Sequence, residues 1–208
     1  MVDVPEKPVS LRERQREQTR SHLMAVAADL IGANGFNATS IDDIAKAAGA
    51  ARATVYSYFE SKEAIVEEIN RAIWDNGEEM YREFGDLGEW NRASVLSWLT
   101  DSVLIRWEHD RPLHRAARKG SSKGIEPMYR AYVDRYVAGF TDNAALWQAR
   151  FSSTETRRRA LMLISMVESY MWKLFTFEAE PDRVEVMGTL ADVFCDVLRA
   201  SEETRGVS

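Results

Sequence analysis

The sequence predicts an all-α protein of about nine helices, and two observations carry this prediction. Long stretches of helix-forming residues are separated by short clusters of Gly and Pro, such as "EKPVS", "GANGFN", "AAGAA" and "RKGSSKGIEP". Alternating apolar and polar stretches long enough to form a strand are absent from the sequence. Hydrophobic residues make up 45% of the 208 residues and charged residues 29%, values typical of a chain that buries a core.

The first helix is predicted to run from Ser10 to about Ala33. Ser10 and Glu13 have the spacing of a capping box, in which each side chain bonds the backbone amide of the other residue. One stripe of this helix is apolar: Leu23, Ala27, Leu30 and Ile31. Arginines recur at every fourth position on another face, a row that suits either solvated surface or contact with phosphate: Arg12, Arg16 and Arg20.

Two short helices joined by a turn are predicted next. Gly35 ends the first helix, and Ser40 with Asp43 forms a second capping box ahead of a helix of about eight residues. The turn "GAA" leads into "RATVYSYF", where Val55 and Phe59 lie four residues apart and face the core. Two short helices around a Gly-containing turn, with a third helix packed on them, are typical of the helix-turn-helix motif.

The stretch "GFNATSIDDIAKAAGAARATVYSYFESKEAIVEEI" resembles the DNA-binding domain of the TetR-type transcriptional regulators. Residues 51–65 match the pattern small-x-x-T-[LV]-Y-x-[YH]-F-x-[SN]-K-E-x-[LI] at nearly every position. The resemblance implies phosphate contacts from four residues: Thr39, Ser40, Thr54 and Lys62. It also implies a recognition helix that presents five residues to DNA: Arg52, Ala53, Tyr56, Ser57 and Tyr58.

Tyr56 has two possible roles, and Ala51 departs from the family pattern. Arg52 has the fork geometry to bind a guanine edge, whereas Tyr56 suits either DNA contact or packing of the small domain. Many relatives have Ser where this chain has Ala51. The N-cap of the recognition helix, which contributes about 1 kcal/mol where it is present, is therefore predicted to be missing.

The fourth helix is predicted to continue to about Phe84. Further helices are predicted over residues 89–110, 112–120, 126–151, 153–180 and 181–200. On this interpretation the chain has a flexible arm (residues 1–9), a helix-turn-helix DNA-binding domain (residues 10–68) and a ligand-binding and dimerisation domain (residues 69–208). The fourth helix, which is predicted to begin behind Glu60 and Ser61, and the short helix around residues 112–119 are expected to couple the two domains.

Aromatic residues are the most informative feature of the C-terminal half. Tyr129, Tyr132, Tyr136 and Phe140 form one helical stripe, which fits either ordinary core or the wall of an apolar pocket with polar handles. This half distantly resembles EthR-type members of the same family, although Val167 and Tyr170 replace a polar pair expected there. The placement of the aromatic residues and the EthR-type resemblance together predict nine ligand contacts: Trp98, Trp107, Tyr129, Tyr132, Val133, Tyr136, Phe140, Tyr170 and Phe194.

The last two predicted helices carry more apolar residues than a single inward face requires. In the family such a pair meets its symmetry mate as a four-helix bundle, so the resemblance implies a homodimer. The expected interface residues are Leu161, Ile164, Met171, Met187, Leu190, Val197 and Leu198. A dimer would place two recognition helices about 34–36 Å apart on successive major grooves, which predicts a palindromic double-stranded operator.

Charge and motif content argue against several other classes of protein. The net charge is −6, yet residues 10–62 hold seven Lys and Arg against six Asp and Glu, so the acidity lies elsewhere. The single Cys195 excludes a disulfide within the chain and a thiolate zinc cluster. "WEHDRPLH" gathers Glu108, His109, Asp110 and His114, but their spacing fits no metal motif.

We therefore expect no enzyme activity, no cofactor and no bound metal, because no phosphate-binding Gly loop or nucleophile elbow is present. The N-terminal stretch has no apolar segment, and no stretch has the length of a membrane span, which predicts a cytoplasmic protein. The expected function is ligand-responsive repression, with a small hydrophobic or aromatic effector that releases the operator. The alternative is a ligand-binding or protein-interaction module whose helix-turn-helix no longer binds DNA.

Overall fold

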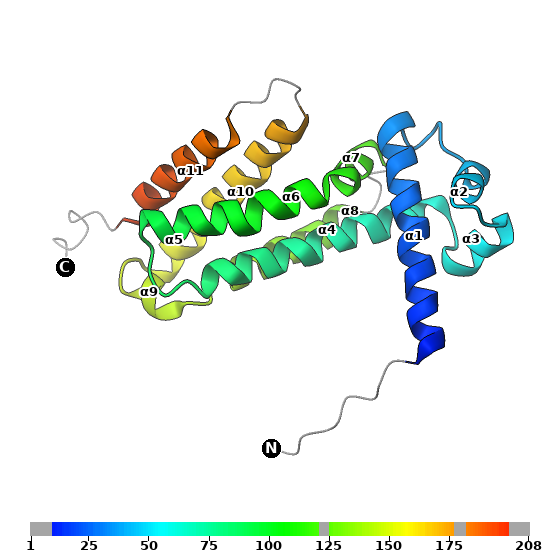
Figure 1. Cartoon of the computed structure of the whole chain (residues 1–208). Helices are drawn as coiled ribbons and strands as arrows, with labels where there is room; N and C mark the ends of the chain where they lie inside the picture. Colours follow the sequence, from blue (N-terminus) through cyan, green and yellow to red (C-terminus); the bar gives the residue numbers. More distant parts are fainter. Residues whose placement is uncertain (1–9, 121–124, 177–181, 200–208) are drawn as a thin grey trace, which may run out of the picture. The chain divides into compact units, whose positions relative to one another are not determined.

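The computed structural model describes residues 10–120, 125–176 and 182–199, and every regular element in these ranges is a helix (Figure 1). The all-α prediction is confirmed for this part of the chain; the arm expected over residues 1–9 lies outside it. The helices form two compact units. Unit 1 contains residues 10–72 and 112–120, and unit 2 contains residues 73–111, 125–176 and 182–199 of the described chain.

Unit 1 is built from α1 (Leu11–Asn34), α2 (Ile41–Ala47), α3 (Arg52–Tyr58), the first part of α4 (Lys62–Gly85) and α7 (Arg111–Lys119). Both predicted capping boxes are confirmed: Ser10 with Glu13 begins α1, and Ser40 with Asp43 begins α2. The two turns that follow α1 and α2 contain Gly35 and Gly49 at positive φ, which favours glycine.

The core of unit 1 is small and aliphatic. Val55 and Phe59 of the α3 segment are buried as predicted, with 0% and 2% of their surface exposed. They pack with the apolar stripes of the other helices, whose buried members are Leu23, Ala27, Ala28, Ile31, Ile44, Ala45, Ile65, Val66 and Ile69. Because Val55 and Phe59 face inward, the side chains between them are left on the outer surface of α3.

Helix α7 belongs to unit 1, although about forty residues of unit 2 separate it in the sequence from residues 10–72 of unit 1. Lys119 donates to the carbonyl oxygens of Gly32 at 2.7 Å and Ala33 at 3.2 Å, in the last turn of α1. The amide of Phe36 donates in return to the carbonyl of Lys119 at 3.2 Å. A cation on the free carbonyls of a helix C-terminus is favourable, so Lys119 supplies the charge that the end of α1 lacks.

His114 of α7 makes the stability of unit 1 sensitive to acid. Burial lowers the pKa of His114 from 6.5 to about 4. The unfolded chain then binds more protons than the folded unit between these values, so stability present above pH 6.5 falls by up to about 3 kcal/mol as the pH drops through 4. Amide hydrogen exchange of unit 1 should accelerate over this range.

His114→Gln should flatten that pH dependence. The control is His22→Gln, which changes an exposed histidine of the same unit and should keep the slope. An unchanged slope in His114→Gln would show that another group controls the acid sensitivity.

Unit 2 consists of the rest of α4, a long helical run, and α8 to α11. The run comprises α5 (Arg92–Ser97), η1 (Trp98–Leu104) and α6 (Ile105–His109), where η1 is a π-helical segment that the sequence did not predict. The other helices are α8 (Ile125–Phe140), α9 (Ala144–Gln148), α10 (Ser153–Thr176) and α11 (Arg183–Leu198). Helix α9 was merged with α8 in the sequence prediction, but Asn143 caps it through a bond from the Leu146 amide at 3.3 Å.

Aromatic rings form the centre of unit 2. Phe84 stacks on Phe140 with ring centroids 4.0 Å apart and meets Trp98 edge-on at 4.9 Å. Trp98 in turn lies 5.7 Å from Phe194, and its indole N–H donates to the Met80 carbonyl at 3.0 Å. Rings at these separations add attraction beyond the area they bury, so α4, η1, α8 and α11 are held by one aromatic cluster.

Helices α4 and α8 approach each other closely at two glycines. A Cβ added to Gly85 would overlap the carbonyl oxygen of Gly139, and one added to Gly139 would lie 3.2 Å from the Arg82 amide nitrogen. We expect Gly85→Ala to destabilise unit 2 by about 1–3 kcal/mol, because backbone cannot move as easily as a side chain. The control is Gly88→Ala, since nothing lies within 4 Å of a Cβ there. Equal urea midpoints for the two variants would contradict the close approach.

Candidate functional site

Helix α3 presents a short row of exposed side chains on unit 1. Arg52, Ala53, Tyr56 and Ser57 are exposed, and Tyr56 keeps 44% of its surface accessible. Thr54 and Tyr58 are half-buried. The predicted absence of an N-cap is confirmed, because Ala51 precedes the helix without any side-chain hydrogen bond to it. Most of the expected DNA contacts thus lie on one seven-residue helix, with Ser57 anchored to the Thr54 carbonyl at 2.7 Å.

Arg52 is held by two neighbouring side chains. Its Nη1 lies 3.0 Å from a carboxylate oxygen of Asp42, and its Nη2 donates to the Tyr56 hydroxyl at 3.4 Å. Both ion-pair partners are largely exposed, so the pair contributes little to stability. The guanidinium is therefore free to exchange Asp42 for another acceptor at small cost.

At the start of α2, where the resemblance implies phosphate contacts, the polar side chains make hydrogen bonds within unit 1. Thr39 is only 2% exposed, and its hydroxyl donates to the Gly35 carbonyl at 2.9 Å, so it holds the turn. Ser40 is exposed, but its amide and hydroxyl both donate to the Asp43 carboxylate, at 2.9 Å and 2.6 Å. These bonds lower the pKa of Asp43. A fixed carboxylate thus already occupies this helix N-terminus.

Lys62 also has an internal role. Its ammonium donates to the carbonyl oxygens of Phe36 at 2.5 Å and Thr39 at 2.6 Å, and it lies 4.1 Å from the centre of the Phe36 ring. The half-buried side chain therefore joins the loop between α1 and α2 to the first residue of α4. An ammonium has three donors, so two are used within unit 1.

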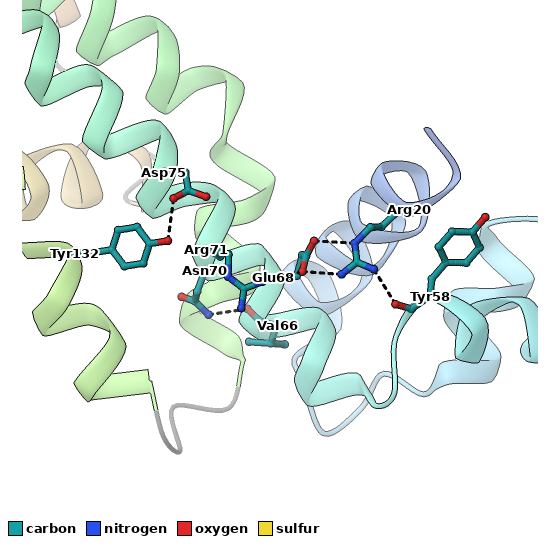
Figure 2. A network of polar contacts seen from close by, with 8 residues as sticks. All are labelled: Arg20, Tyr58, Val66, Glu68, Asn70, Arg71, Asp75 and Tyr132. Atoms are coloured by element: carbon teal, nitrogen blue, oxygen red, sulfur yellow. Dashed lines mark hydrogen bonds and ion pairs between the residues drawn. The ribbon is translucent and has the colours of Figure 1, made fainter. Parts of the chain in front are cut away.

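Arg20 is the residue whose role the sequence could not show (Figure 2). Its Nε and Nη2 each lie 2.8 Å from one oxygen of the Glu68 carboxylate, and its Nη1 donates to the Tyr58 carbonyl at 2.9 Å. The guanidinium also lies 4.6 Å from the centre of the Phe59 ring. The hydrogen bond from Arg20 lowers the pKa of Glu68. Arg20 thereby fixes the C-terminal end of α3 to both α1 and α4.

The other two arginines of the α1 row stay exposed. Arg16 lies 5.9 Å from the centre of the Tyr58 ring, and Arg12 is one turn further from Arg20. They border an open hollow of about 770 Å³ between α1 and the end of α3, lined by Arg12, Gln15, Arg16, Gln18, Thr19, His22, Ser57 and Tyr58. Two guanidinium groups among amides and hydroxyls offer donors of the kind that bind a phosphate backbone.

This helix-turn-helix geometry agrees with a known family. Residues 23–69 match the model described as "Bacterial regulatory proteins, tetR family". Residues 23–69 therefore match the DNA-binding domain of the TetR family. This chain is similar to the transcriptional repressor KstR2 of Rhodococcus jostii, 39% identical over 83 residues, which are 40% of this chain and 41% of that protein. It is also 50% identical over 52 residues to the putative mycofactocin biosynthesis regulator MftR of Mycobacterium tuberculosis, across 25% of this chain and 26% of MftR.

The chain matches only about two fifths of the length of KstR2, but its similarity to solved structures extends further. The TetR-family regulator PfmR of Thermus thermophilus has 20% identity and a TM-score of 0.66, covering 84% of this chain and 97% of PfmR. The fatty acid degradation regulator FadR of Bacillus halodurans has 15% identity and a TM-score of 0.65, covering 88% and 97%. These structures share the all-helical fold; the resemblance to EthR-type members stays a prediction.

The expected ligand contacts of unit 2 fall into two groups. Trp98, Phe140 and Phe194 are part of the aromatic centre and are at most 4% exposed, while Trp107 stacks on Phe175 at 6.2 Å. Tyr132 donates its hydroxyl to Asp75 at 2.8 Å, and Val133 is half-buried. Tyr129 and Tyr170 are 43% and 39% exposed, whereas Tyr136 is 2% exposed. The spacing of aromatic residues in a sequence shows which face of a helix they share, but not how deeply each one is buried. The predicted set therefore contains both buried and accessible rings.

Most of the expected dimer residues also face the core of unit 2. Ile164, Met171, Met187, Leu190 and Leu198 are at most 5% exposed, and Leu161 and Val197 are half-buried. The apolar stripes of α10 and α11 are largely used by their own unit. Three other apolar residues of the same helices are exposed instead, at 59%, 72% and 38%: Met162, Val184 and Val193.

The Glu108–His114 segment has internal partners. Glu108 pairs with Arg183, and Asp110 accepts a hydrogen bond from the Asn76 amide at 2.7 Å. Within the described residues, no group of three or more His, Cys, Asp or Glu side chains could hold a metal ion. No helix in the same part of the chain combines the length and apolarity needed to span a bilayer.

Proposed function

We propose that this protein is a sequence-specific DNA-binding transcriptional regulator that binds a palindromic operator as a homodimer. The observation that carries the proposal is the exposed row Arg52, Tyr56 and Ser57 on α3 of a TetR-type domain. Arginine binds guanine in the major groove through two parallel hydrogen bonds, and tyrosine binds phosphate or packs on thymine methyl groups. A regulator of this kind acts on DNA in the cytoplasm.

The geometry supports a division between the residues that touch DNA and those that position them. Arg12 and Arg16 suit the phosphates that flank the major groove contacted by α3. Thr39 and Lys62 support the same surface from behind, through bonds to backbone carbonyls. The net charge of −6 then limits binding to DNA that fits this small surface.

Repression and release by a small hydrophobic or aromatic effector complete the proposed function. KstR2, which the TetR-type domain resembles, is described as a transcriptional repressor. The accessible tyrosines Tyr129 and Tyr170 of unit 2 suit a ligand with an apolar body. For the homodimer we favour the exposed side chains Met162, Val184 and Val193 over the buried stripes, because only surface residues can meet a second copy.

Arg52→Ala should lower operator affinity by about 5- to 150-fold, equivalent to about 1–3 kcal/mol, and relax the base preference at one position of each half-site. The measurement is fluorescence anisotropy with an operator selected from random DNA and its base-substituted versions. Arg52→Lys is the matched variant, because it keeps the charge but loses the fork. Unchanged selectivity in Arg52→Ala would remove this residue from base recognition.

The alternative hypothesis is that the chain is a ligand-binding or protein-interaction module that no longer binds DNA. This hypothesis predicts a different result for the unmodified chain. Selection from random DNA would then enrich no sequence, and any retained DNA would bind without a preference. A regulator predicts enrichment of a palindrome together with affinity that falls as salt rises.

A further inference from the structure

Glu168 of α10 has no cationic partner in the described part of the chain, although it is half-buried in unit 2. The Tyr81 hydroxyl of α4 donates to its Oε1 at 2.9 Å, and this is its one hydrogen bond there. Tyr81 itself is fully buried. A buried carboxylate normally has a positive partner, because a single hydroxyl offsets only part of its lost hydration.

Three tyrosines from α4 and α8 lie near this carboxyl. Tyr136 of α8 lies with its ring centroid 5.0 Å from that of Tyr81, and its hydroxyl points at Gly77 of α4, where an added Cβ would lie 2.5 Å away. Burial, and next the charge of Glu168, raise the pKa of both Tyr136 and Tyr129. We call Glu168, Tyr81, Tyr129 and Tyr136 the Glu168 cluster; its three tyrosines are the titratable groups that face the carboxyl from α4 and α8.

The Glu168 cluster is accessible from outside. Tyr129 is 43% exposed, and the Glu168 side chain is half-buried rather than sealed. Its second oxygen, Oε2, has no hydrogen-bond partner among the described residues. A ligand in solution can therefore reach both the carboxyl and the Tyr129 ring.

The free energy of ionising the carboxyl indicates what the Glu168 cluster would bind. Burial raises the pKa of Glu168 from 4.5 to about 7, while the bond from Tyr81 opposes this rise. The proton is therefore held loosely at neutral pH, and a positive ligand would replace it. Tyrosine faces also attract cations through the negative charge of the ring, so the carboxylate and the rings favour the same ligand charge.

We propose that the effector of this protein is an organic cation with an apolar or aromatic body, whose positive nitrogen pairs with Glu168 beside the tyrosines of the Glu168 cluster. The proposal rests on the proposed function, in that it names the chemical class of the effector. Binding transfers no atoms except one proton, which leaves the Glu168 carboxyl for the solvent as the ion pair forms. Affinity for the cation therefore rises as the pH passes upward through 7.

The test uses matched arylalkyl probes on the full chain without DNA. Calorimetry measures 4-phenylbutylamine and its trimethylammonium analogue against the neutral 4-phenylbutan-1-ol and the anionic 4-phenylbutyrate. The cations are expected to bind at least about tenfold more tightly than the alcohol. Titrations in two buffers of different ionisation enthalpy should show proton release near pH 7.

Glu168→Gln should remove the preference, lowering amine affinity about tenfold or more while leaving the alcohol within about twofold. Glu79→Gln is the control, because it makes the same change at an exposed carboxylate of α4 in the same unit. Equal binding of cations and alcohol, no binding of either cation, or an unchanged preference in Glu168→Gln would each overturn the proposal.

Operator binding is measured separately, so the two proposals fail independently. Loss of the cation result with intact operator selection rejects only the effector class. Cation binding at Glu168 without any DNA preference rejects the regulator and leaves a ligand-binding protein.

Discussion

Arg20→Ala should reduce operator affinity by at least about tenfold and lower the stability of unit 1 by about 2–4 kcal/mol, although Arg20 lies on α1 and not on the recognition helix. Three charge-assisted hydrogen bonds disappear, two to Glu68 and one to the Tyr58 carbonyl. Arg20 is 30% and Glu68 24% exposed at the side chain, so the carboxylate left behind is only partly hydrated. The end of α3 then loses its tie to α1 and α4.

Two variants separate positioning by Arg20 from contact with DNA. Arg20→Lys keeps the charge but cannot make the paired bonds to Glu68 together with the bond to Tyr58, so it should recover only part of the stability. Arg16→Ala removes an exposed arginine of the same row and should leave the urea midpoint unchanged while reducing the salt dependence of binding. Full stability of Arg20→Ala with weakened DNA binding would mean that Arg20 contacts DNA directly.

Glu168→Gln should stabilise unit 2 at alkaline pH by up to about 3 kcal/mol and leave its stability near pH 4.5 unchanged. The folded unit holds the proton more tightly than the unfolded chain, since burial raises the pKa of Glu168 from 4.5 to about 7. Stability therefore falls as the pH rises from 4.5 to 7 and stays low above it. Glutamine carries no charge to desolvate, and its amide oxygen still accepts a bond from Tyr81.

Urea unfolding at pH 5 and pH 8.5 measures this effect. Glu79→Gln should keep the loss of stability between the two pH values, because its exposed carboxylate is hydrated in both states. If Glu168→Gln is no more stable than the unmodified chain at pH 8.5, Glu168 is not the desolvated group. The direction is opposite to that of His114 in unit 1, where acid is destabilising.

The features predicted correctly are those set by neighbouring residues in the sequence. Ser10 with Glu13 and Ser40 with Asp43 act within three residues, so the spacing alone identifies the caps. The inward direction of Val55 and Phe59 follows from helical periodicity, and with it the outward direction of Arg52 and Tyr56. The bare cap at Ala51 is likewise a local property.

The features missed depend on partners distant in the sequence. Arg12, Arg16 and Arg20 share one spacing, and only the third meets Glu68, 48 residues away. Glu168 looks like one more charge on α10, because its tyrosines come from α4 and α8. Residues 112–120 join unit 1 through Lys119 and α1, which no local pattern indicates.

How deeply each apolar side chain is buried could also not be predicted from the sequence. An apolar stripe shows which face of a helix is hydrophobic but not whether its own unit or a second copy covers it. Met171, Met187 and Leu190 were predicted to form a dimer interface and are buried within unit 2. Trp98 and Phe194 pack on each other, and their contact with a ligand stays a prediction. The accessible candidates, such as Met162 and Tyr129, are identified only by their exposure.

Operator preference tests DNA-binding function most directly. The affinity of the full chain for a duplex selected from random DNA is compared with its affinity for a scrambled duplex of the same composition at about 150 mM salt. We predict a palindromic sequence with half-sites about one helical turn apart and a preference of at least about 10³-fold. Equal affinity for the two duplexes would contradict sequence-specific regulation by this protein.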